Sequence, residues 1–122
     1  MKILVCGSRD WVNKEVIFYA LEALHPKNEI DIIHGDAPGA DRMAAEYAEA
    51  LEFRSVTPYR ADWKSFGKAA GFKRNLEMLD QEPDLVIAFW DGMSKGSKHT
   101  IDQAVARGIE VRVVEQPDWR GK

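Results

Sequence analysis

The chain has 122 residues, enough for one domain with a buried core and too few for two. Hydrophobic residues make up 45% of it and no stretch approaches the roughly 18 consecutive apolar residues of a membrane span, so we expect a soluble globular protein. The net charge of −3 argues against broad nucleic-acid affinity, because such affinity rests on a basic surface. A single cysteine, and a first strand that leaves no room for a signal peptide, predict a cytoplasmic location.

The first predicted strand is a continuous apolar run that begins at Lys2 and breaks at Gly7. Continuous rather than alternating apolar order is typical of a strand covered on both faces, so Cys6 is expected to be a core residue. Gly7 allows a turn and a close backbone approach to a ligand, and Ser8 and Arg9 add a hydroxyl and a guanidinium suited to a phosphate. Taken alone, these three residues fit a plain turn with a surface arginine equally well.

The next elements continue the alternation of helix and strand. Residues 13–25 carry apolar side chains at helical spacing, with Asn13 as the expected cap. Residues 30–34 are short and β-branched and predict the second strand. The loop over 35–41 contains two glycines and leads into a helix that ends near residue 52.

The second half of the chain repeats this pattern. We expect a strand over 53–57, a polar connection over 58–67 of the kind that forms a site wall, a helix from 68 to 80 or 81, a strand over 84–90, a small-residue loop over 91–97, a helix over 98–107 and a strand over 110–114. The helix after residue 67 has a predicted buried stripe of Ala69, Phe72, Leu76 and Leu79. Lys68, Gly71 and Asn75 share a face beside this stripe, and helical spacing predicts that Arg74 points away from that face. Residues 116–122 are expected to form a polar tail with one aromatic residue, Trp119.

Five strands that alternate with four helices predict an α/β fold over residues 1–115, a single doubly wound Rossmann-like domain. Its five-stranded parallel sheet is expected in the order 3-2-1-4-5. In such sheets ligands bind at the carboxyl ends of the strands, where the strand order reverses. The loops after the first, second and fourth strands are the glycine-rich ones, so a ligand site is expected at that edge.

The charged residues near these loops indicate an anionic ligand. Two of the loops open helices, whose N-terminal amides attract phosphate. Neither loop matches the dinucleotide or the P-loop pattern. Asp36 and Asp41 can cap a helix, bind a ribose hydroxyl or act as acids and bases. The nearby cations are Arg9, Lys68, Lys73, Arg74, Lys95 and Lys98, of which Lys73 and Lys98 are expected to be solvated surface charge.

Aromatic and histidine residues leave alternatives open. Trp11, Trp63 and Trp90 sit at or near strand ends, where a ring can stack on a base or close the edge of the core. His34 and His99 have no cysteine or carboxylate at metal-ligand spacing, so no metal is expected, and no cofactor either.

Several motifs together resemble the YspA-like branch of the SLOG superfamily, the Rossmann-type group that includes LOG phosphoribohydrolases and the DNA-processing protein DprA. They are the segments 7–10, 34–41, 61–63, 67–71 with 74–75, and 88–89 leading to 94–97. The resemblance implies a nucleotide, ribose-phosphate or ADP-ribose-like ligand. The binding residues that we expect are Gly7, Ser8, Arg9, Asp10, Gly35, Asp36, Gly39, Ala40, Asp41, Lys68, Arg74, Asn75, Ser94, Gly96, Ser97 and Thr100.

Three functions follow as hypotheses. The first is a sensor or ligand-handling module that binds a nucleotide. The second is an N-glycosidic hydrolase of nucleoside monophosphates, in which Asp36 or Asp41 replaces the LOG glutamate, because Thr100 stands where that residue would fall. For this role Asp41 is expected to stay ionised, since a helix N-terminus lowers its pKa. The third is DprA-like binding of single-stranded DNA, against which the net charge argues. A membrane partner is not expected, and a homo-oligomer is left open.

Overall fold

The structure, a computed structural model, describes residues 1–115, so the predicted tail with Trp119 lies outside the described residues. All five strands pair in parallel in the order β3-β2-β1-β4-β5, which confirms the predicted fold and strand order. The strand order reverses between β1 and β4, as expected. The strands are β1 (Lys2–Gly7), β2 (Asp31–His34), β3 (Ser55–Pro58), β4 (Leu85–Trp90) and β5 (Glu110–Glu115).

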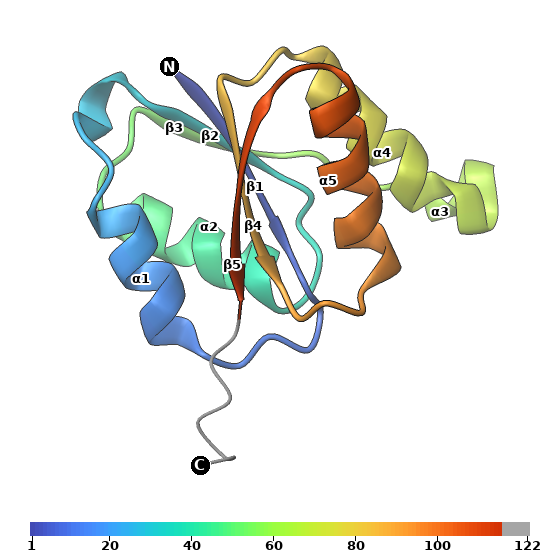
Figure 1. The fold of residues 1–122 in the computed structure, drawn as a ribbon, viewed down its shortest axis with the longest axis horizontal. Coiled ribbons are helices and arrows are strands. Elements are labelled where there is room, and N and C mark those ends of the chain that lie inside the picture. The colour runs from blue at the N-terminus through green and yellow to red at the C-terminus, as the bar shows by residue number, and fades with distance from the viewer. Residues whose placement is uncertain (116–122) are drawn as a thin grey trace.

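Helices cover both faces of the sheet (Figure 1). One face is covered by α1 and α2 and the other by α4 and α5, as the figure and the two core clusters agree. None of the helices within residues 1–115 is long and apolar enough to cross a lipid bilayer. The helices are α1 (Lys14–Glu22), α2 (Ala40–Ala50), α3 (Trp63–Phe66), α4 (Ala70–Asp80) and α5 (Lys95–Ala106), with 3₁₀ turns η1 (Lys27–Glu29) and η2 (Gly67–Ala69).

The apolar run of β1 divides its side chains between the two faces. Ile3 and Val5 pack in the cluster under α1 and α2, whereas Leu4 and Cys6 pack in the cluster under α4 and α5. Successive side chains of a strand point to opposite faces, so a central strand covered on both sides must be apolar at every position. This explains why the run is continuous rather than alternating.

Two helix ends differ from the prediction. The first helix ends at Glu22 rather than residue 25, with Ala23 as its C-cap. The last helix begins at Lys95 rather than 98, because the Ser94 hydroxyl accepts a hydrogen bond from the Ser97 amide and caps it. Gly96 and Ser97 therefore lie in the first turn of α5 and not in a loop.

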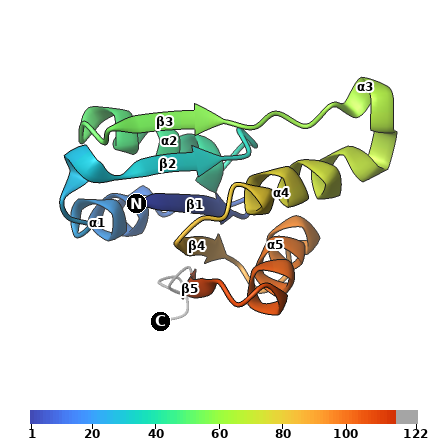
Figure 2. The ribbon, with the colours of Figure 1, turned by 90° about the horizontal axis from the view of Figure 1, so that it is seen from above.

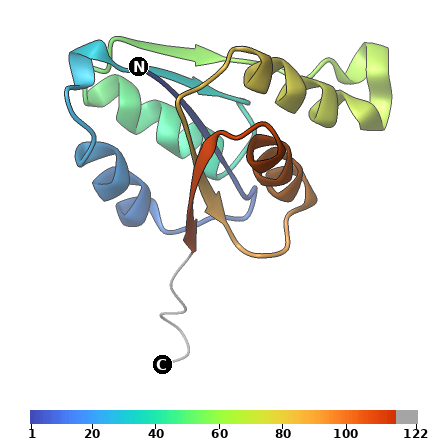
Figure 3. The same cartoon turned by 45° about the horizontal axis from the view of Figure 1, so that its top comes forward.

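A short helix, α3, interrupts the predicted polar connection. The Asp62 carboxylate caps it by accepting from the Ser65 amide at 3.1 Å. Seen from above, α3 stands at the far end of the connection that leaves β3, beyond the start of α4 (Figure 2). The turned view shows the same arrangement, with α3 projecting from the body of the domain (Figure 3).

The predicted stripe of α4 was wrong at its start. Ala69 belongs to η2 and is exposed, and Phe72 is also exposed. Since α4 begins at Ala70, its inward face contains Ala70 and Met78, with Arg74 one turn from each. Arg74 therefore points toward the sheet edge, contrary to the expectation from helical spacing.

Candidate functional site

A cleft of about 220 Å³ opens at the carboxyl edge of the sheet, beside the point where the strand order reverses. It is bordered by the end of β1, the loop between β2 and α2, one side of α4 and the N-terminal half of α5. Sequence-predicted residues that line it are Gly7, Arg9, Asp41, Lys68, Arg74, Asn75, Ser94, Gly96, Ser97 and Thr100. Loops far apart in the sequence thus meet around one space.

A second hollow of about 300 Å³ adjoins the cleft. Both are lined by Arg9, Ala37, Trp63 and Arg74, so these four residues form the border between them. Of the predicted residues, the second hollow adds Gly35 and Asp36; it also has Arg42 and Arg60, which the sequence did not single out as ligand residues.

Within the described chain, four predicted residues line neither hollow: Ser8, Asp10, Gly39 and Ala40. Ser8 is fully buried, where its hydroxyl accepts from the Asp91 amide at 3.0 Å and its carbonyl from the Ala40 amide at 3.1 Å. Gly39 has a φ of +83°, and a Cβ there would lie 2.5 Å from the Ser8 carbonyl oxygen. These residues hold the loops after β1 and β2 against each other, whereas Asp10 is exposed.

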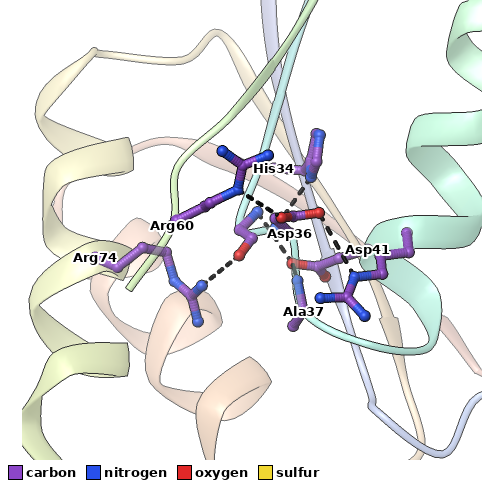
Figure 4. Close-up of polar contacts among 8 residues, drawn as sticks. His34, Asp36, Ala37, Asp41, Arg60 and Arg74 are labelled. Atoms are coloured by element: carbon purple, nitrogen blue, oxygen red, sulfur yellow. Dashed lines mark hydrogen bonds and ion pairs between the residues drawn. The ribbon is translucent and has the colours of Figure 1, made fainter. Parts of the chain in front are cut away.

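Asp41 lies in the first turn of α2 and is buried. Its Oδ2 accepts from the amides of Gly35 at 3.0 Å and Ala37 at 3.4 Å, so the carboxylate shapes the loop after β2 (Figure 4). Burial raises the pKa of Asp41 to about 6, although the Arg74 charge and the amides act in the opposite direction. The expectation of a lowered pKa was wrong, because desolvation outweighs the helix N-terminus here.

Arg74 joins α4 to the same loop. Its Nη1 donates to the Gly35 carbonyl at 2.5 Å and its Nε to the Asn75 Oδ1 at 3.0 Å. Asn75 in turn donates from Nδ2 to the Gly96 carbonyl at 3.2 Å, which ties α4 to the first turn of α5. Burial lowers the pKa of Arg74, the Asp41 charge acts in the opposite direction, and the Arg9 charge adds to the lowering. Arg9 and Arg74 both line the cleft, and within residues 1–115 neither has a carboxylate at ion-pair distance.

Asp36 follows β2 with a φ of +52° and faces the second hollow. Its carboxylate accepts from Arg60 Nε at 2.9 Å and lies 3.6 Å from Arg42 Nε. The Arg60 hydrogen bond keeps the pKa of Asp36 below its usual range. In Figure 4 Arg60 and His34 approach Asp36 from different sides. The Asp36 amide donates to His34 Nδ1 at 3.0 Å, and burial lowers the pKa of that histidine.

Of the three candidate tryptophans, Trp63 lines both hollows and is 51% exposed. Its ring lies over Gly71, where a Cβ would meet it at 3.4 Å. Trp11 is buried with its ring edge-to-face on Phe89, and Trp90 is partly buried with its indole nitrogen bonded to the Ser94 carbonyl. A free face for stacking is therefore available on Trp63.

Some lining residues were missed. Cys6, Phe72 and Met78 reach the cleft wall, and the pKa of the Cys6 thiol is raised by burial, which keeps it protonated. Arg42 and Arg60 could have been predicted only by knowing that α2 and the connection after β3 meet at Asp36. The cations away from the lining behave as ordinary surface charge: Lys73 lies over the Phe66 ring and Lys98 pairs with Asp102 at 2.6 Å. In the described part of the chain, no three His, Cys, Asp or Glu side chains are placed to hold a metal ion.

Comparison with known proteins identifies the family. The profile of the YspA, cpYpsA-related SLOG family matches residues 1–66. The chain belongs to this family. A relative of the chain is the gene 61 protein of Mycobacterium phage D29, which is 38% identical over 116 residues that cover 90% of this chain and 93% of the phage protein. The SLOG resemblance seen in the motifs is thereby confirmed.

Solved structures with the same fold include two DNA processing proteins. DprA from Streptococcus pneumoniae superposes with a TM-score of 0.78 at 19% identity, over 98% of this chain. The superposition covers 52% of that DprA chain, so this chain spans about half its length. DprA from Helicobacter pylori superposes with a TM-score of 0.71 at 21% identity, again over 98% of this chain and 67% of its own. At these identities the similarity is one of fold.

The second of these structures corrects one expectation. The Helicobacter pylori protein is described for its single-stranded DNA binding mode, so arguing against nucleic acid as a partner was wrong. The argument failed because net charge is a sum over the whole surface. Locally, the second hollow gathers Arg9, Arg42, Arg60 and Arg74 against the single carboxylate of Asp36.

Proposed function

We propose that this SLOG-family protein binds a nucleotide or a nucleotide-derived ribose phosphate in the cleft. The observation that carries the proposal is the pair formed by Arg9 and Arg74. Both guanidiniums line the cleft, and within residues 1–115 neither has a carboxylate at ion-pair distance, although the more distant Asp41 charge acts on Arg74. A bound phosphate can accept charge-assisted hydrogen bonds from both side chains.

The first turn of α5 supplies the other half of the anion site. Ser94 caps this twelve-residue helix, and Gly96 and Ser97 line the cleft beside it. Backbone amides at a helix N-terminus favour negative charge, and Lys68 adds a cation on the opposite wall. Trp63 offers an aromatic face at the same opening for the base.

Binding is testable with the intact protein by calorimetry and thermal shift. The panel contains nucleoside 5′-monophosphates of the four bases, ADP and ADP-ribose. A ligand at 100 times its Kd should stabilise the fold by about 2.7 kcal/mol. Arg74→Gln should weaken that ligand by about tenfold or more, since a charge-assisted hydrogen bond is lost. The proposal fails if no member of the panel binds below millimolar concentration.

The matched control is Arg107→Gln. Arg107 pairs with Asp80 at 2.8 Å, which links the far ends of α4 and α5 away from the cleft. This variant loses one arginine charge, as Arg74→Gln does, but should keep the ligand affinity of the wild type. Equal losses in both variants would mean that net charge, and not the cleft, governs binding.

Binding of single-stranded DNA is the second candidate. It is favoured by the two adjoining hollows, which are lined by four arginines between them and share Trp63 as a lining residue. Such a surface combines a cationic track with an aromatic face for a base. A gel shift with an oligonucleotide should then show affinity that falls steeply as salt rises, whereas a mononucleotide pocket should leave the oligonucleotide unbound.

The hydrolase hypothesis stays a prediction of the sequence. Asp36 is occupied by Arg60 and Arg42, and Asp41 by the amides of Gly35 and Ala37. Neither arrangement favours a carboxylate that is free to stabilise a ribosyl cation. Release of free base from the same nucleotide panel would support catalysis. If Asp41→Asn no longer released the base, the catalytic role would be assigned to Asp41.

A further inference from the structure

The second hollow contains two arginines, Arg42 and Arg60, that do not line the cleft of the proposed nucleotide site. Arg42 and Arg60 reach it from α2 and from the connection after β3, and both converge on Asp36. Together with Arg9 and Arg74, which it shares with the cleft, this hollow holds four arginines and one aspartate. A depression with this excess of positive charge should attract an anion.

The geometry at Asp36 leaves donors available. Arg60 and Arg42 both approach the carboxylate through Nε, at 2.9 and 3.6 Å. Among residues 1–115, the terminal nitrogens of these two guanidiniums make no hydrogen bond. The arginine side chains are 76% and 57% exposed, while that of Asp36 is only 24% exposed. The carboxylate thus lies beneath two cationic groups whose outer edges face solvent.

We propose that Arg42 and Arg60 form a second phosphate subsite beside the first, so that the ligand is a nucleotide with two phosphoryl groups rather than one. This inference rests on the proposed nucleotide site and specifies its substrate class. The first phosphate lies at Arg9, Arg74 and the start of α5. The second lies over Arg42 and Arg60. Because Arg9 and Arg74 border both hollows, one diphosphate placed at these two residues can reach both subsites.

Asp36 has a defined part in this arrangement. It holds the two arginines in place before a ligand arrives, and its negative charge then opposes the second phosphate. Removal of that charge should therefore strengthen diphosphate binding, whereas removal of either arginine should weaken it. Asparagine adopts a positive φ as readily as aspartate, so Asp36→Asn should keep the loop conformation.

The experiment compares ligands with one and two phosphoryl groups on each variant at low ionic strength. The probes are AMP with ADP and, to remove any dependence on the base, inorganic phosphate with pyrophosphate. We expect the wild type to prefer the diphosphate member of each pair by about tenfold. In the double variant Arg42→Gln/Arg60→Gln this preference should fall to near unity with phosphate affinity kept, and Asp36→Asn should increase the preference.

The control is Arg112→Gln, an exposed arginine paired with Glu110 on β5, which should retain the wild-type preference. Absence of binding by every probe to the wild type would overturn the nucleotide site itself. Binding with the same diphosphate preference in the double variant would overturn the second subsite alone. A loss of diphosphate preference in Asp36→Asn would also overturn it, since removal of the negative charge between the two arginines should strengthen their contact with a phosphate.

Discussion

The two faces of the sheet are built differently. Under α1 and α2 lies a large cluster that includes Trp11, Ile17, Leu21 and Phe89, all at most 1% exposed. Under α4 and α5 the cluster is smaller, and Asn75, Ser97 and Thr100 are buried beside it where the cleft opens. The first face therefore supplies apolar burial, and the second gives up part of that burial to place polar groups around a cavity. Stability and binding should be separable by face.

The largest expected effect comes from Leu21→Ala on the first face. Leu21 is fully buried, so truncation should lower the free energy of unfolding by about 2–5 kcal/mol through lost burial and a cavity. Chemical denaturation measures this loss, and calorimetry with the best ligand of the panel measures affinity. Because Leu21 is far from the cleft lining, the folded fraction should keep wild-type affinity.

The contrasting variant is Met78→Ala on the second face. Met78 is equally buried but lines the cleft, so its truncation should lower both stability and affinity. If Leu21→Ala also weakened the ligand, the separation of the two faces would not hold.

A smaller effect is expected from Asp41→Asn, seen in the pH dependence of stability. The folded-state pKa is raised to about 6 from the model-peptide value of 3.8, so between these two values the folded state binds more protons than the unfolded state. The free energy of unfolding should then decrease as pH rises from 4 to 6, by at most about 3 kcal/mol from this group. In Asp41→Asn that part of the slope should disappear, whereas an unchanged slope would assign it to another group.

Much of the fold could be predicted because its signals are local. Continuous apolar runs mark β1 and β4, and the Asn13 side chain caps α1 by accepting from Val16 as expected. The short helix α3 escaped prediction because four residues are too few to show a helical period. The start of α5 was placed late because Gly96 and Ser97 are poor helix formers, and only the Ser94 cap shows that they are helical.

The site was less predictable because its contacts are not local. Arg74 lies one helical turn from Met78, on the face of α4 that begins at Ala70. The apolar spacing of the sequence instead predicted a buried face that begins one residue earlier, at Ala69. The family motif, and not the helical period, pointed to Arg74. The pairing of Arg60 with Asp36 joins two connections 24 residues apart, and no pattern within either connection indicates it. The pKa of Asp41 depends on burial, which only the assembled loops determine.

The smallest effect expected compares two glycines in matched positions. Gly71 and Gly96 are each the second residue of a helix, α4 and α5, and both line the cleft. Alanine at either site should stabilise its helix by about 0.5–1 kcal/mol, because glycine loses more backbone entropy on folding.

At Gly71 the new methyl would meet the Trp63 ring at 3.4 Å, an ordinary contact. At Gly96 nothing lies within 4 Å, so the methyl would project into open space beside the proposed phosphate. Gly71→Ala should thus raise the melting temperature with affinity kept, and Gly96→Ala should raise it while weakening the nucleotide severalfold. Equal affinities in the two variants would remove the start of α5 from the anion site and leave Arg9 and Arg74 as its remaining support.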